Sequence, residues 1–151
     1  MDQTLVPMGI REDTDPFEEM KDALTSGYRD FSGRSTRSQF WTFHIFSLVL
    51  VAFAAMPAIF TGNEAWSAVT TLPVLVGLFI PLLAITARRL HDTGRTAKLA
   101  VIAIIPWLGA LLLLIILMAD SEPEVNQWGE SPKFIYDTPK TQRHPRWSSA
   151  A

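Results

Sequence analysis

The sequence predicts an all-α integral membrane protein with three transmembrane helices. A short cytoplasmic amphipathic helix precedes them, and an extended, proline-rich C-terminal tail follows. Two observations predict this class. Of the 151 residues, 48% are hydrophobic and only 19% are charged, a high apolar share for a chain of this length. The charges are also segregated, because three long runs contain no Asp, Glu, Lys or Arg: residues 40–60, 65–87 and 99–119.

Each of these runs is long enough to cross a bilayer as a helix. A helix rises about 1.5 Å per residue, so about 20 residues cross a hydrocarbon core of roughly 30 Å. The third run is rich in Leu, Ile and Val, and it lacks the polar positions that a buried helix of a soluble bundle would carry. Pro106 and Gly109 leave a re-entrant hairpin as the alternative for this run, whereas its length favours a kinked span.

The segment DPFEEMKDALTSGYRDF, before the first run, predicts the amphipathic helix. Pro16 suits a first helical turn, and Glu18 and Glu19 complement the positive helix N-terminus. Apolar side chains recur three and four residues apart in one stripe: Phe17, Met20, Leu24 and Tyr28. Because the polar face is not basic, we expect this helix to pack against the cytoplasmic loop, a partner or the headgroup plane.

Basic residues are distributed unevenly between the loops. The connection TGNE, between the first two runs, has none. They gather before the first run, at Arg29, Arg34 and Arg37, and between the second and third, at Arg88, Arg89, Arg95 and Lys98. The positive-inside rule therefore places the N-terminus and the RRLHDTGR loop in the cytoplasm, and the TGNE turn and the C-terminus outside it. The acidic N-terminus lacks a continuous apolar core, so we expect no cleaved signal peptide.

The RRLHDTGR loop is the main candidate for a site. If the second helix continues into it, Arg88 and Asp92 lie four residues apart and can pair. Gly94 then offers a helix stop, and Thr96 offers a cap for the third run. We expect Arg34, Arg37 and Arg89 to face lipid phosphates. The full set of candidate contacts at this cytoplasmic edge is Arg34, Arg37, Arg88, Arg89, His91, Asp92 and Arg95.

Two interpretations of this basic edge are open. Arginine beside tryptophan at a membrane edge is ordinary interfacial anchoring. Alternatively, the side chains converge on an anionic headgroup, a phosphorylated ligand or an acidic partner.

Three motifs in order, FSGRSTRSQFW, RRLHDTGR and NQWGESPK, resemble a bacterial inner-membrane family, the domain of unknown function 805 or YhaH-type proteins. The resemblance implies a small polytopic membrane domain over residues 16–133. It leaves residues 1–15 as a polar N-terminal extension and residues 134–151 as a C-terminal extension. Members often carry bulky aromatics after the loop motif, where this chain has Ala97, Lys98 and Leu99. The family has no established activity, so the resemblance implies no catalytic residues.

Enzyme chemistry is not expected. The three histidines, His44, His91 and His144, are separated by the expected topology, which argues against a shared metal site. The chain has no cysteine and no glycine-rich phosphate loop. We therefore expect no catalytic, cofactor-binding or metal-binding residues, with phospholipid as the one possible bound molecule. The basic residues sit at a membrane edge, so nucleic acid is not expected as a partner.

An interaction role remains. The tail after Met118 is punctuated by prolines and lacks a periodic apolar pattern, which predicts that it orders only against something else. We expect an accessory subunit of a larger membrane complex, with energy-converting assemblies among the candidate hosts. The expected anchors are the tail aromatics Trp128, Phe134, Tyr136 and Trp147. The alternative is an anionic-lipid or small-ligand binding protein, which would purify alone or as a homo-oligomer; a transporter component is less favoured.

Overall fold

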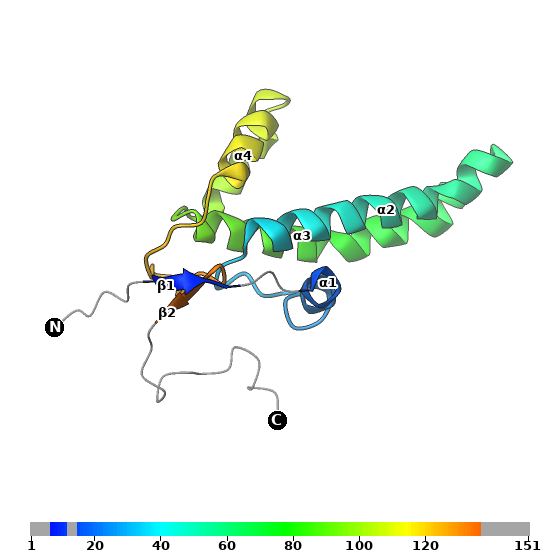
Figure 1. Ribbon diagram of the computed structural model, residues 1–151. Helices are drawn as coiled ribbons and strands as arrows, with labels where there is room; N and C mark the ends of the chain where they lie inside the picture. Colours follow the sequence, from blue (N-terminus) through cyan, green and yellow to red (C-terminus); the bar gives the residue numbers. More distant parts are fainter. Residues whose placement is uncertain (1–6, 12–14, 137–151) are drawn as a thin grey trace. The chain divides into compact units, whose positions relative to one another are not determined.

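A computed structural model describes residues 7–11 and 15–136 (Figure 1). The described chain is mostly helical. Its elements in chain order are β1 (Pro7–Ile10), α1 (Pro16–Leu24), α2 (Arg37–Thr61), the π-helical turn η1 (Ser67–Thr71), α3 (Leu72–Asp92), the 3-10 helix η2 (Ala97–Ile104), α4 (Leu108–Met118) and β2 (Phe134–Tyr136).

The described residues form two compact units. We call residues 15–31 and 38–86 the hairpin unit, and residues 7–11, 32–37 and 87–136 the network unit.

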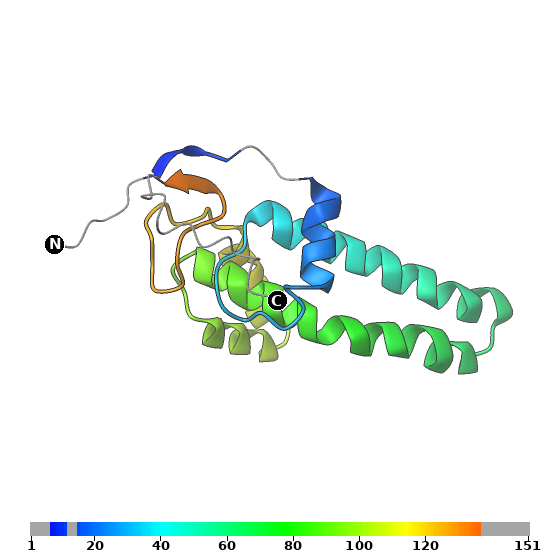
Figure 2. The same ribbon diagram turned by 90° about the horizontal axis from the view of Figure 1, so that it is seen from below.

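The hairpin unit contains two helices that run antiparallel, side by side, in both ribbon views (Figures 1 and 2). By length and composition, Arg37–Thr61 and Ser67–Asp92 can each cross a membrane, which confirms the first two predicted spans as helices of spanning length. Each helix also buries apolar side chains, and Phe43 and Ile85 are almost fully buried. Near the connecting turn, the Thr70 hydroxyl donates to the Ala54 carbonyl at 2.6 Å.

The predicted amphipathic helix is present as α1, although it ends at Leu24. Asp15 caps it, because its side chain accepts a hydrogen bond from the Phe17 N–H at 2.9 Å. Tyr28 lies in the turns after the helix and donates its hydroxyl hydrogen to the Gly77 carbonyl at 2.7 Å. In a regular helix, the Gly77 carbonyl would accept a hydrogen bond from the N–H of residue 81. Residue 81 is proline, which has no N–H, and the Tyr28 hydroxyl takes the place of the missing donor.

The third apolar run is not one spanning helix. Within the network unit it is divided into η2 and the eleven-residue α4, which pack against each other on either side of a turn at residues 105–107. Pro106 and Gly109 explain the break. Pro106 cannot continue a helical hydrogen-bond ladder. A Cβ at Gly109 would lie 1.8 Å from the Ile102 carbonyl oxygen, so only glycine permits this approach of the two arms.

The expectation of one kinked helix over residues 99–119 is therefore wrong, because the run folds back on itself as two short helices, the shape that the alternative requires. A single spanning helix and a hairpin of two short helices have the same apolar composition. Composition therefore cannot distinguish them, and the length of the run favours the span. The predicted cap at Thr96 also differs, since its side chain makes no capping hydrogen bond to η2. The predicted helix stop is confirmed, because α3 ends at Asp92, two residues before Gly94.

Residues of the two expected extensions pair as a small antiparallel sheet, which no pattern in the sequence predicts. Strand β1 pairs with β2, with Pro7 opposite Tyr136 and Ile10 opposite Phe134 (Figure 1). The Arg11 N–H continues the pairing to the Lys133 carbonyl at 2.8 Å.

Candidate functional site

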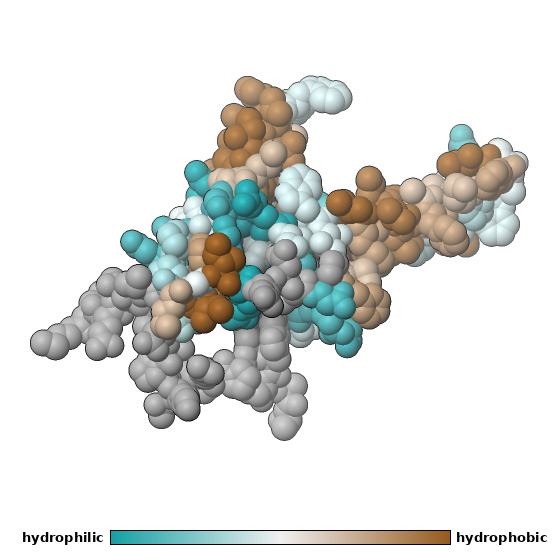
Figure 3. Space-filling model, viewed as in Figure 1, coloured by the Kyte–Doolittle hydropathy of each residue, from teal (hydrophilic) through white to brown (hydrophobic). Residues whose placement is uncertain are grey.

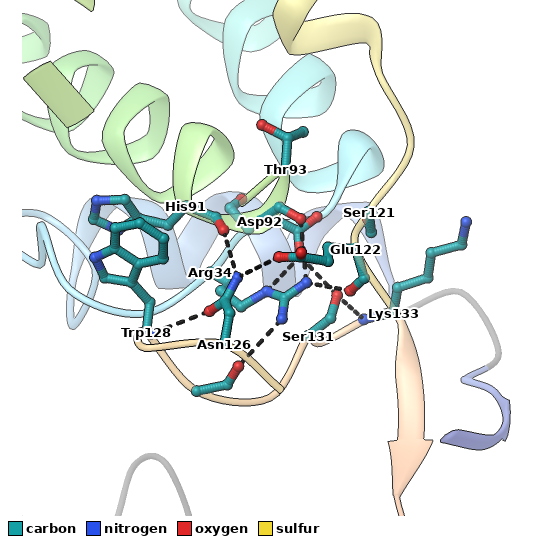
Figure 4. A network of polar contacts seen from close by, with 12 residues as sticks. Arg34, His91, Asp92, Thr93, Ser121, Glu122, Asn126, Trp128, Ser131 and Lys133 are labelled. Atoms are coloured by element: carbon teal, nitrogen blue, oxygen red, sulfur yellow. Dashed lines mark hydrogen bonds and ion pairs between the residues drawn. The ribbon is translucent and has the colours of Figure 1, made fainter. Parts of the chain in front are cut away.

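The three sequence motifs meet in one buried polar network in the network unit (Figure 4). Its centre is Asp92, the last residue of α3. One carboxylate oxygen accepts from Arg34 Nε at 3.0 Å and from the Ser131 hydroxyl at 2.7 Å, and the other accepts from Arg89 Nη1 at 2.6 Å. Both ion pairs have fully buried side chains. The network thus joins all three motifs, through Arg34 in the first, Arg89 and Asp92 in the second and Ser131 in the third.

Arg34 engages five acceptors, as many as a guanidinium has N–H groups. Besides the Asp92 carboxylate, it donates to four main-chain carbonyls: those of Asp92 at 3.1 Å, Glu124 at 2.7 Å, Gly129 at 3.2 Å, and Glu122. The Asp92 carbonyl lies at the C-terminus of α3, where a helix leaves carbonyls without internal partners and carries partial negative charge. Arg34 therefore caps α3 and fixes the returning segment 122–129 against it.

Arg89 does the same for α4. Its Nε donates to the Leu117 carbonyl at 3.0 Å and its Nη2 to the Ala119 carbonyl, both at the C-terminal end of α4. Nη1 also lies within hydrogen-bond reach of the Ser35 carbonyl at 3.3 Å and the Ser121 hydroxyl at 3.4 Å. Arg89 sits one turn before the end of α3, so this single side chain ties the ends of two helices together.

The third motif contributes a tight turn as well as side chains. The Asn126 and Gly129 backbones bond each other, and Gly129 has a φ of +102°, a conformation that favours glycine. The turn presents the Gly129 carbonyl to Arg34. The Asn126 amide donates to the His91 carbonyl at 3.0 Å, and the Trp128 ring stacks on the His91 ring at 4.2 Å between centroids (Figure 4).

The charge balance of the network is uneven. Two guanidinium cations, of Arg34 and Arg89, share one buried carboxylate, that of Asp92. Carbonyls at two helix C-termini supply the remaining negative partial charge. Burying ions is costly unless their hydrogen-bonding groups are matched, and here every nitrogen of both guanidinium groups donates to at least one acceptor.

The exposed rim of the network carries a looser ion cluster. Asp120 accepts from Lys133 Nζ at 2.5 Å and lies 3.4 Å from Arg37, with more than half of its side chain exposed. The hydrogen bond from Lys133 is the main reason that the pKa of Asp120 lies below its ordinary value. Tyr136, in contrast to Asp120, is buried, and burial raises the pKa of its hydroxyl, which donates to the Pro123 carbonyl at 2.8 Å.

The predicted contacts at the cytoplasmic edge divide into two groups. Arg37 and Arg95 are exposed, whereas the others are buried: Arg34, Arg88, Arg89, His91 and Asp92. The expectation that Arg34 and Arg89 face lipid phosphates is therefore wrong, because their guanidinium groups point into the chain. Spacing singled out Arg88 as the partner of Asp92, but the ion pairs described above come from Arg34 and Arg89.

The predicted tail anchors are used within the chain itself. Trp128 stacks on His91, Tyr136 is buried, and Phe134 has Lys133 Nζ 5.3 Å from its ring centroid. The sequence predicts that the tail orders only when something holds it, and up to residue 136 the contacts come from the chain's own Arg34, Arg89 and Asp92. Trp147 lies outside the described residues.

The predicted separation of the tail from the loop is also wrong for residues 119–136. A spanning third helix puts them on opposite faces of a membrane, but they bond directly to Arg34, Arg89 and Asp92. The C-terminus itself lies outside the described residues. Sequence reasoning missed Ser35, Ser121, Asn126 and Ser131 as network residues; Asn126 had a signal, because it opens the third motif.

Over residues 7–11 and 15–136, no three histidine or acidic side chains gather in a group that would hold a metal ion. What the network does chemically is join chain segments that lie far apart in the sequence.

Comparisons with known proteins agree with the motifs. A family model described as "Protein of unknown function (DUF805)" matches residues 28–130. The chain is 30% identical over 112 residues to the inner membrane protein YhaI of Escherichia coli K12, covering 74% of this chain and 93% of YhaI. It is 29% identical over 113 residues to the inner membrane protein YhaH of the same strain, with the same coverage. No solved structure matches. The chain belongs to the DUF805 family and, like these relatives, is a membrane protein.

Proposed function

We propose that this protein is a non-catalytic accessory subunit of a larger inner-membrane assembly. One observation carries the proposal: the motif residues best suited to chemistry are engaged inside the chain. Arg34, Arg89 and Asp92 are buried and bonded to one another or to main-chain carbonyls. Their role is to hold the fold, which leaves the outer surface to carry the function.

That outer surface is dominated by apolar side chains on the two long helices. Figure 3 shows apolar residues over much of the visible face of α2 and again over α4. Large exposed side chains on the hairpin unit include Leu48 at 73%, Phe53 at 77% and Val76 at 65%. Inside a membrane such faces meet either lipid or the helices of another protein, and close packing between helices stabilises the second arrangement. We propose that part of this surface docks against the host assembly.

The positive-inside rule supports a cytoplasmic position for the network unit. Arg37, Arg95 and Lys98 are exposed on it, whereas the turn that joins the two spans carries Glu64 and no basic residue. We propose that this turn faces the periplasm, as the relatives' inner-membrane location implies for a bacterial cell.

Purification from native membranes in mild detergent tests the subunit proposal. We expect the chain in a discrete complex of fixed stoichiometry. A photo-crosslinking residue at Leu48 or Val76 should attach to the same host polypeptide, while one at Arg11, on the exposed end of the small sheet, serves as the control outside the spans. If the chain purifies alone or as a homo-oligomer, and both span positions link only to lipid or to itself, the proposal is wrong.

Binding of anionic lipid is the second candidate, favoured by the exposure of Arg37 and Arg95. It predicts that native mass spectrometry of the purified chain finds retained phosphatidylglycerol or cardiolipin. Retention should fall in the Arg37→Gln and Arg95→Gln variants and persist in Arg29→Gln, an exposed arginine of the hairpin unit. Equal retention in all three variants contradicts this candidate.

A further inference from the structure

We propose that the hairpin of η2 and α4 inserts into the lipid of one leaflet, entering and leaving on the side of the polar network without crossing the membrane. The inference does not depend on the accessory-subunit proposal. It assigns an interaction surface, residues 97–119, and a partner of defined chemistry, the acyl chains of the leaflet next to the network.

The length of the arms argues against crossing. Helix α4 has 11 residues, which at about 1.5 Å per residue gives roughly 16 Å, about half of a 30 Å hydrocarbon core. The 3-10 helix η2 has eight residues, which at about 2.0 Å per residue also gives roughly 16 Å. The two arms are therefore matched in length, and both stop near the depth where the leaflets meet.

Both ends of the hairpin are tied to the same turn of α3. At the entry, the Arg95 N–H donates to the Leu90 carbonyl at 2.9 Å. At the exit, the Leu117 and Ala119 carbonyls accept from Arg89, and the Glu122 N–H donates to the Asp92 carbonyl at 2.8 Å. A segment whose two ends are fixed within one buried network has to return to the side from which it started.

The surface of the hairpin is apolar on every side. No charged residue occurs from Leu99 to Ala119, and Lys98 and Asp120 mark its two ends. Trp107, in the turn between the arms, is 90% exposed. Other large apolar side chains exposed along the two arms include Val101, Ile104, Leu108, Leu111, Ile115 and Met118.

This pattern favours lipid over a protein partner. A protein interface combines an apolar centre with a polar rim and direct hydrogen bonds, and the indole N–H of Trp107 is the one polar side-chain group that residues 99–119 offer for them. Acyl chains need none. At ~25 cal/mol per Å² of apolar surface removed from water, an apolar hairpin of this size gains strongly from entering hydrocarbon.

The turn at residues 105–107 is also suited to hydrocarbon. Irregular backbone in lipid is costly because its polar groups lack partners. Here Pro106 has no N–H, and the neighbouring N–H groups of Ile105, Leu108 and Gly109 bond to the Ile102, Pro106 and Ile105 carbonyls. The reversal therefore brings few unmatched donors into the membrane.

The natural absence of cysteine makes a direct test possible. Single cysteines replace Lys98 and Gln127, which flank the hairpin and are exposed, and Glu64, in the turn between the spans. They are labelled in intact cells and in inverted membrane vesicles with a membrane-impermeant maleimide. We expect Lys98→Cys and Gln127→Cys to react from the same side and Glu64→Cys from the opposite side. Reaction of Gln127→Cys from the Glu64 side would mean that residues 99–119 cross the membrane, and would overturn the proposal.

A second measurement separates lipid from a protein or aqueous environment. The Trp107→Cys variant, labelled with a nitroxide, is reconstituted in nanodiscs of phosphatidylcholine and phosphatidylglycerol, with Gln127→Cys as the aqueous control. Collision with oxygen reports hydrocarbon and collision with a nickel chelate reports water. We expect Trp107→Cys to show high oxygen and low nickel accessibility, and Gln127→Cys the reverse. Low accessibility to both at Trp107→Cys indicates protein burial, and high nickel accessibility indicates water; either result overturns the proposal.

Discussion

The two units of this protein are stabilised by opposite kinds of interaction. In the hairpin unit, the buried side chains of the two long helices are mainly apolar, such as Phe43 and Ile85. In the network unit, two arginines and an aspartate are buried at the junction of segments more than 50 residues apart in the sequence. Apolar packing accepts many side chains of similar volume. A buried guanidinium donates its N–H groups in fixed directions, so it is stable only where hydrogen-bond acceptors lie in those directions.

This difference explains where the recognisable motifs fall. In the network unit, a different residue type could not make the same hydrogen bonds, because each donor or carbonyl has a specific partner. The residues held in this way are Arg34, Arg89, Asp92, Asn126 and Gly129. Residues of the spans are constrained mainly by hydrophobicity and size. The polar network rather than the membrane-spanning surface therefore carries the sequence signature of the fold.

The largest expected effect follows from breaking the network at its centre. Asp92→Asn keeps the shape of the side chain but removes the one carboxylate that serves two buried guanidinium groups. Leaving buried charges without their counter-ion typically costs about 3–5 kcal/mol. We expect a loss of that size in the free energy of unfolding, measured by SDS titration in mixed micelles.

Asp120→Asn is the matched control. Asp120 also meets two cations, Lys133 and Arg37, but its side chain is 58% exposed. Exposed ion pairs contribute only about 0–1 kcal/mol, because water competes for both charges. Equal losses in the two variants would show that burial does not distinguish the network from its rim.

A smaller effect is expected from closing the space at a glycine. Gly109→Ala places a Cβ 1.8 Å from the Ile102 carbonyl oxygen. This oxygen belongs to the main chain and cannot move unless η2 and α4, both in the network unit, separate. Overpacking of this kind costs about 1–3 kcal/mol. Gly77→Ala is the control in the hairpin unit, because the added Cβ meets no neighbouring atom within 4 Å. Alanine has a better helix propensity than glycine, so we expect this variant to gain up to about 1 kcal/mol in the free energy of unfolding. Thermal unfolding of both variants in the same detergent measures the contrast. A stabilising Gly109→Ala would mean that the two arms are not in close contact.

The sequence predicted the parts of the fold that depend on composition. Uncharged runs predicted the two spans, and Pro16 with Glu18 and Glu19 predicted α1. It did not predict the hairpin of η2 and α4, because an apolar run gives the same signal whether it crosses a membrane or reverses within it. Gly109 marks a possible break in the sequence, but its close approach to Ile102 depends on two segments meeting in space.

The candidate site was predicted in its residues and not in its arrangement. The motifs identify Arg34, Arg89 and Asp92 as candidates, but they do not predict that these side chains are buried. Local spacing pairs residues three or four apart on a helix, so it cannot find the bond of Arg34 to Asp92, 58 positions away. Positive charge at a membrane edge also suggests lipid contact by default, unless the partners that bury it are known.

The smallest expected effect concerns a polar contact within the hairpin unit, where apolar packing otherwise dominates. Tyr28→Phe keeps the ring and removes the hydroxyl that donates to the Gly77 carbonyl. In a membrane that carbonyl has no water to replace the lost donor, and we expect a loss of about 0.5–2 kcal/mol in the free energy of unfolding in mixed micelles.

Pro81 makes this contact separable from simple packing. Pro81→Ala restores an N–H one turn after Gly77, and that N–H can donate to the same carbonyl. Tyr28→Phe should therefore cost less in the Pro81→Ala background than in the natural chain, even though Pro81→Ala alone changes a fully buried side chain. A double-mutant cycle in mixed micelles isolates this difference. An equal loss of unfolding free energy for Tyr28→Phe in both backgrounds would show that the hydroxyl does not replace the N–H missing at Pro81. The hairpin unit would then be stabilised by apolar packing at this position as well.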